Sequence, residues 1–120
     1  AALDRMRAIA VAMADALAAA RLDEVRALLA EHWAHQRSLH PRIPTPRIDA
    51  VVERAERSGA LGLKALGASG GGCVLAIAED GREEELAAAI EPLGQRLEFG
   101  IDRDGFQVIA VLDEQHGAEQ

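Results

Sequence analysis

A glycine-rich loop between two apolar runs constrains this chain more than any other stretch. Residues 59–66 and 73–78 are mostly apolar, and the six residues 67–72 between them contain four glycines. Glycine allows positive φ angles and lets a ligand approach the backbone amides closely. A simple hairpin turn needs fewer glycines. The loop is therefore a candidate anion site, in which backbone N–H groups bind an oxyanion or a phosphate.

The residues on either side of the loop exclude two common nucleotide-binding motifs. A Rossmann or Walker loop requires a helix directly after the glycines. Here the loop continues into residues 73–78, a short apolar run rich in strand-forming residues. The sequence therefore predicts strand, loop and strand. A bulged hairpin without a ligand is the alternative interpretation.

The apolar spacing in the first half of the chain is helical. Apolar residues three and four positions apart predict helices over 2–20, 22–39 and 46–58, the first two forming an antiparallel hairpin. Thr45 is the expected N-cap of the third helix, with Pro46 at its first position.

The second half of the chain predicts more strands. The run 73–78 is apolar throughout and is expected to be a central strand covered on both faces. A capping-box spacing over 80–83 predicts a fourth helix that ends near Pro92. Apolar residues alternate with polar ones over 97–101 and again at 106–108, which predicts two further strands. The predicted class is α+β.

Composition excludes several classes of partner. At 120 residues the chain is one domain, small for an enzyme that binds two substrates. The net charge of −7, with two Phe and one Trp, argues against nucleic acid or an anionic membrane as partner. The single cysteine cannot form an internal disulfide, so a cytoplasmic location is expected. Because the chain lacks an initiator Met, we expect it to derive from a longer protein.

One segment reverses the acidic character of the chain. Residues 32–48 contain three Arg and three His and no Asp or Glu. Arg suits bidentate recognition of phosphate, so Arg37, Arg42 and Arg47 are candidate anion ligands. The alternative is a solvated helix end, where basic residues complement the helix dipole. His32 and His35 lack a third metal ligand, and no metal site is predicted.

Four other residues were also considered, and two of them have two interpretations each. Lys64 either faces an anion near the loop or points to solvent, and Trp33 either stacks on a sugar or packs in the core. Asp49 is expected to stabilise the first turn of its helix through the helix dipole. Cys73 is expected to be a buried, unreactive thiol at the start of a strand.

The sequence around the loop resembles a known kinase family. The segment 64–73, Lys-Ala-Leu-Gly-Ala-Ser-Gly-Gly-Gly-Cys, is similar to the third conserved motif of the GHMP small-molecule kinases, with Ser69 in place of the usual Gly. The resemblance includes residues 44–49 and 59–62. Trp33 and the segment 37–39 are similar to kinases that act on heptose phosphates.

The resemblance implies a fold and a function. The fold would be a ferredoxin-like antiparallel sheet with helices on one face over 41–113, after a helical hairpin over 1–40 and before a frayed tail over 114–120. The chain would be the C-terminal, substrate-binding domain of a GHMP-type sugar kinase, most similar to the heptose-phosphate kinases. Such kinases use ATP and Mg²⁺ and bind ATP largely through a separate N-terminal domain. The signature loop of that domain is absent here, so catalytic residues are not assigned and the isolated chain is expected to be inactive.

The resemblance also assigns candidate site residues. The substrate would contact Arg37, Lys64 and Trp33. The nucleotide would contact the loop residues Gly67, Ala68, Ser69, Gly70, Gly71 and Gly72. The competing interpretation is a non-catalytic module that binds a phosphorylated metabolite, or one that forms a homodimer through the Ala-rich helix 2–20.

Overall fold

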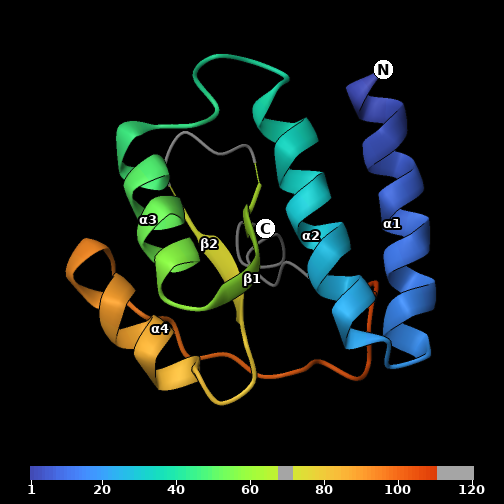
Figure 1. Ribbon diagram of the computed structural model, residues 1–120. Helices are drawn as coiled ribbons and strands as arrows, with labels where there is room; N and C mark the ends of the chain where they lie inside the picture. Colours follow the sequence, from blue (N-terminus) through green and yellow to red (C-terminus); the bar gives the residue numbers. More distant parts are fainter. Residues whose placement is uncertain (68–71, 111–120) are drawn as a thin grey trace, which may run out of the picture.

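The computed structural model describes residues 1–67 and 72–110. Their elements are α1 (Ala2–Ala18), α2 (Leu22–Arg37), α3 (Pro46–Arg57), β1 (Ala60–Ala65), β2 (Val74–Ala78), α4 (Glu83–Ile90) and the short 3-10 helix η1 (Glu91–Leu93). Figure 1 shows the β1–β2 hairpin between α3 and α2, with α1 on the outer side of α2. The predicted α+β class with an N-terminal helical hairpin is confirmed.

The α1–α2 hairpin lies within the residues predicted for it, with each helix ending two residues earlier than expected. Its turn contains Ala20 with a φ of 55°, and the Arg21 N–H donates to the carbonyl of Ala16 at 2.9 Å. Ile9 and Ala16 are the buried residues of α1. Helix α1 packs along α2 on the side away from the sheet, so this hairpin extends the helical layer (Figure 1).

Local chemistry fixes the start and the end of α3. The hydroxyl of Thr45 accepts a hydrogen bond from the Ile48 N–H at 3.1 Å, with Pro46 at the first helical position, as predicted. After the helix ends, Gly59 takes a φ of 95° and leads the chain into β1. These two signals orient α3 so that its apolar face meets the hairpin.

One hydrophobic cluster joins the hairpin to the helices. It contains residues of α2, α3, β1 and α4: Trp33, Ile48, Val52, Ala55, Leu63, Ala65 and Leu86. The strands are antiparallel, with Leu63 opposite Ala76 and Ala65 opposite Val74. Burial of this cluster holds the strand ends, and thus the entrance to the glycine-rich loop, against α2 and α3.

Strand β1 and helix α2 approach each other very closely at Gly62. A Cβ atom at this position would lie 2.6 Å from the carbonyl oxygen of Arg26. Any side chain here would therefore displace the helix backbone. Glycine at residue 62 is required by this contact between strand and helix.

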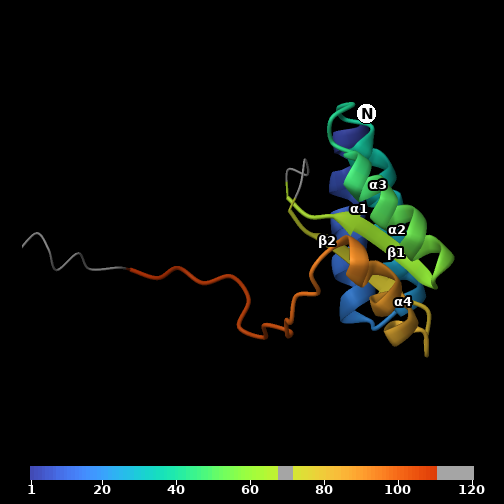
Figure 2. The same ribbon diagram turned by 90° about the vertical axis from the view of Figure 1, so that its left-hand side faces the viewer.

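The two predicted C-terminal strands are not formed. Among the described residues the sheet contains β1 and β2 alone, and residues 95–110 run away from the helices in Figure 2. Their apolar side chains are exposed, Phe99 by 77% and Phe106 by 94%. An alternating pattern specifies which side chains share a face, but a strand also needs a neighbour to accept its hydrogen bonds.

Two smaller predictions were also wrong. Strand β2 is half-buried at every position, because no second layer covers its other face in the described chain. The predicted capping box over 80–83 is absent, since α4 begins after Arg82 without a side-chain cap. The Arg82 guanidinium instead pairs with Glu79 and Glu85.

The membrane prediction has one structural test. No helix in the described ranges is long and apolar enough to cross a bilayer.

Candidate functional site

The base of the glycine-rich loop is closed by the hairpin. The Leu66 N–H donates to the carbonyl of Cys73 at 2.9 Å, one residue beyond the paired strands on each side. Gly67 enters the loop with a φ of 70° and Gly72 leaves it with a φ of 82°. L-residues with side chains rarely adopt these left-handed angles, so both glycines are required by the backbone. The remaining predicted loop residues, Ala68, Ser69, Gly70 and Gly71, lie outside the described residues.

Helix α2 contacts the loop entrance through Gln36. The Gln36 Nε2 donates a hydrogen bond to the carbonyl of Gly67 at 3.1 Å, and the side chain is only 5% exposed. We did not predict a role for Gln36 from the sequence. The available signal was its place at the end of the buried α2 seam of Val25, Leu29 and Trp33. A polar residue that continues such a seam needs a partner inside the fold.

Arg37 and Trp33 form a stacked pair at the same end of α2. The Arg37 guanidinium carbon lies 5.8 Å from the centre of the Trp33 ring, a cation–π distance. Arg37 also forms an ion pair with Asp49 in the first turn of α3, at 3.3 Å. Its side chain is 42% exposed, so the guanidinium remains accessible to a ligand. Asp49 thus orients Arg37 in addition to its predicted place at the N-terminus of α3.

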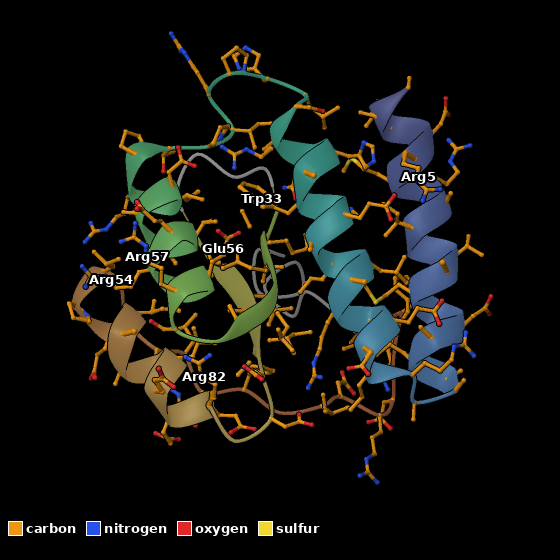
Figure 3. The ribbon with its side chains drawn as sticks, in the orientation of Figure 1. Arg5, Trp33, Arg54, Glu56, Arg57 and Arg82 are labelled. Carbon is orange, nitrogen blue, oxygen red and sulfur yellow. The ribbon has the colours of Figure 1, made fainter. Side chains whose placement is uncertain are left out.

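Trp33 occupies the packing position that we considered as one of its two roles. It is 5% exposed, and Figure 3 shows it between α2 and the hairpin. Little of the indole is available to stack on a sugar. At this end of α2, Arg37 is thus the exposed side chain of the pair and Trp33 the buried one.

Lys64 lies three residues before Gly67 on β1 and is half-buried. Burial lowers the pKa of Lys64, because the charged ammonium loses solvation. The pKa of His32 on α2 is also lowered, first by burial and then by the charges of Lys64 and His35. No ion pair among the described residues involves Lys64. Lys64 is thus a cation near the loop without a carboxylate partner in the described chain.

The other members of the basic segment are dispersed. The Arg47 Nε donates to the carbonyl of Leu93 at 3.0 Å, and His35 lies 3.8 Å from Glu31. These contacts fit the alternative interpretation of a helix end and its connection. In the ranges that the structure covers, no three His, Cys, Asp or Glu side chains gather as a metal site would require.

Cys73 differs from its prediction. The thiol is exposed rather than buried, because β2 begins one residue later at Val74. The apolar run 73–78 does not indicate this boundary, because Cys73 is as apolar as the strand residues after it. Because Cys73 is exposed and directly follows Gly72, the rate at which its thiol is labelled can be used to detect binding at the loop base.

Two surface depressions of the described residues lie away from the candidate site residues. One lies between α3 and η1 and the other on the proline-rich connection 41–46. Neither includes Arg37, Lys64 or Gly67. The described residues thus provide a loop base that Gln36 contacts, with Arg37 next to Gln36 at the end of α2 and Lys64 three residues before Gly67 on β1.

Comparison with known proteins agrees with the resemblance seen in the loop. The family described as "GHMP kinases C terminal" matches residues 13–93, which include α2, α3, the hairpin and α4. A mevalonate kinase of Pyrococcus horikoshii is 42% identical over 70 residues, which are 58% of this chain and 21% of that protein. The matched part spans about a fifth of the length of this relative. The chain belongs to the family of GHMP kinase C-terminal domains.

Proposed function

We propose that this chain acts as the C-terminal domain of an ATP-dependent GHMP-type kinase that phosphorylates a small molecule. The observation that carries the proposal is the loop base. Gly67 and Gly72 take left-handed angles at the two ends of the glycine-rich segment. Arg37 directly follows Gln36, which contacts Gly67, and Lys64 lies three residues before Gly67 on β1. Backbone N–H groups and cations together suit phosphate groups. The family match supports the assignment to a kinase.

The acceptor is proposed to be a small alcohol that bears an anionic group. The similarity of Trp33 and Arg37 to heptose-phosphate kinases favours a sugar phosphate, whereas the curated relative is a mevalonate kinase. Arg37 suits either case, because a guanidinium binds phosphate and carboxylate through the same planar fork. Its ion pair with Asp49 fixes the direction from which an anion can approach. Kinase assays with a panel of acceptors would therefore identify the substrate.

The residues of this chain indicate which part of phosphoryl transfer this domain would serve and which part a second domain would serve. Phosphoryl transfer depends on positioning and on charge stabilisation of the transferring group. Lys64 and Arg37 supply positive charge, and the loop supplies backbone donors. Mg²⁺ would neutralise the phosphates of ATP, and its ligands would come mainly from a second domain, because the described residues hold no cluster of metal ligands. We therefore propose that this domain forms one wall of the catalytic cleft.

The proposed function is tested with the protein in which this domain occurs. Purified protein is given ATP and Mg²⁺ with mevalonate, a heptose phosphate or other small anionic alcohols, and ADP release is followed. We expect release with one acceptor class and none without acceptor. The competing function, a non-catalytic binding module, predicts no release, together with tight binding of a phosphorylated metabolite by the 120-residue chain alone.

A further inference from the structure

We propose that Gln36 is a positioning residue for the glycine-rich loop. Its side chain holds the carbonyl of Gly67, the residue at which the chain passes from β1 into the loop, and so fixes the position of the Gly67 peptide. The consequence for ligand binding rests on the proposed function. The positioning role itself rests on contacts within the described chain.

The burial of Gln36 is the first observation. Among the buried residues that the structure describes, Gln36 has the one amide side chain. It continues the seam of Val25, Leu29 and Trp33, where a leucine would pack without any polar group to satisfy. Burying an amide is unfavourable unless it forms hydrogen bonds. The bond from Gln36 Nε2 to the Gly67 carbonyl partly offsets this cost.

The second observation concerns the carbonyl oxygen of the same Gln36 amide. The Gln36 Oε1 atom is buried and has no hydrogen-bond partner among the described residues. Because Oε1 and Nε2 are bonded to one carbon, this free acceptor also lies at the loop entrance. A buried amide oxygen normally accepts a hydrogen bond, and Oε1 accepts none from the described residues.

The third observation is that no other described contact orients the carbonyl of Gly67. The glycine is exposed, and a Cβ built on it would meet nothing within 4 Å, so packing does not hold it. The neighbouring bond from the Leu66 N–H to the Cys73 carbonyl closes the hairpin but does not orient the Gly67 carbonyl. The hydrogen bond from Gln36 Nε2 orients this carbonyl. Helix α2 thereby determines the position of the peptide from which the loop departs.

The first experiment follows backbone hydrogen exchange by NMR in the 120-residue chain. Gln36→Met keeps the size of the side chain and removes both polar atoms. We expect the Leu66 amide at the loop base to exchange about tenfold faster. The Glu79 amide, which donates to Gly59 at 2.7 Å at the far end of the hairpin, should be unchanged and serves as the control. An unchanged Leu66 amide, or equal acceleration of both amides, would overturn the proposal.

The second experiment measures kinetics in the kinase that carries this domain. Gln36→Met should raise the KM for ATP by about tenfold, since one hydrogen bond that orients the site is lost. A variant that merely folds less well would leave KM unchanged. Gln36→Leu also removes the donor and the acceptor of the side chain, and should show the same rise. A wild-type KM in either variant would contradict the positioning role. A wild-type protein without kinase activity would contradict the proposed function, and the exchange experiment would still decide the role of Gln36.

Discussion

The guanidinium of Arg37 lies 3.3 Å from the carboxylate of Asp49, and the two residues come from the end of α2 and the start of α3. The pair spans the proline-containing connection between these helices. It leaves Arg37 stacked on Trp33 with part of its surface free. An arginine held in this way loses less conformational freedom when it binds an anion, which makes it a suitable first contact for a substrate.

Arg37→Ala is therefore expected to weaken acceptor binding. The KM for the anionic acceptor should rise roughly tenfold to a hundredfold, because a hydrogen bond to a charged group contributes about 1.5–3 kcal/mol. The free energy of unfolding should change by less than about 1 kcal/mol, since the ion pair is solvent-exposed. Steady-state kinetics and urea denaturation measure the two effects.

Arg57→Ala is the matched control for Arg37. Arg57 pairs with Glu53 at 2.6 Å on α3, and its side chain is 77% exposed. It should have wild-type kinetics. Equal loss of acceptor binding in both variants would show that net charge, rather than the position of Arg37, matters.

Gly62→Ala should destabilise the fold. The added Cβ would lie 2.6 Å from the backbone carbonyl oxygen of Arg26, which cannot rotate away as a side chain could. We expect a loss of about 1–3 kcal/mol in the free energy of unfolding, as for other overpacked sites. Gly94→Ala is the control, because Gly94 is extended with a φ of −173° and a Cβ there meets nothing within 4 Å. Similar unfolding midpoints in urea for the two variants would refute the close contact between α2 and β1.

His32 should make stability depend on pH. Its pKa is lowered from 6.5 in the folded chain, so the unfolded chain binds more protons at mildly acidic pH. Stability is therefore fully present above pH 6.5 and falls as pH drops from there through the lowered pKa. His32→Gln should reduce this loss between pH 7 and pH 5, measured by thermal unfolding. A wild-type slope in His32→Gln would mean that His32 does not titrate as described.

Cys73 should react in the folded protein. Because the thiol is exposed, a disulfide reagent such as DTNB should label it stoichiometrically without denaturant. In the intact kinase, ATP with Mg²⁺ should slow labelling, since Cys73 follows Gly72 directly at the loop base. A thiol that reacts only after unfolding would contradict the described strand boundary. Labelling that ATP does not slow would argue against a nucleotide at this loop.

Much of the fold was predictable because its signals are local. Helical spacing, the Thr45 cap and Gly59 after α3 specify their elements without help from distant residues. The hairpin was predictable because two apolar runs flank the glycine-rich loop and the second run is rich in strand-forming residues. The predictions for residues 97–108 failed for the opposite reason. Alternation at Leu97 and Phe99 is a local signal, but a strand depends on a partner.

The candidate site was predictable only in part. Arg37 and the loop glycines were predicted through a family resemblance and stay predictions, whereas the contact of Gln36 was not predicted. This contact is a hydrogen bond between residues 31 positions apart, which no local pattern encodes. Cys73 was misplaced because a boundary shift of one residue moves a side chain from a strand to an exposed loop base.

The most direct test of the proposed function compares two proteins in one assay. ADP release from ATP and Mg²⁺ is measured for the 120-residue chain and for the protein in which it occurs, over a panel of small anionic alcohols. We expect acceptor-dependent release from the complete protein and none from the chain alone. Release from the chain alone, or a folded complete protein that phosphorylates no member of the panel, would contradict the assignment of this domain as one wall of a kinase cleft.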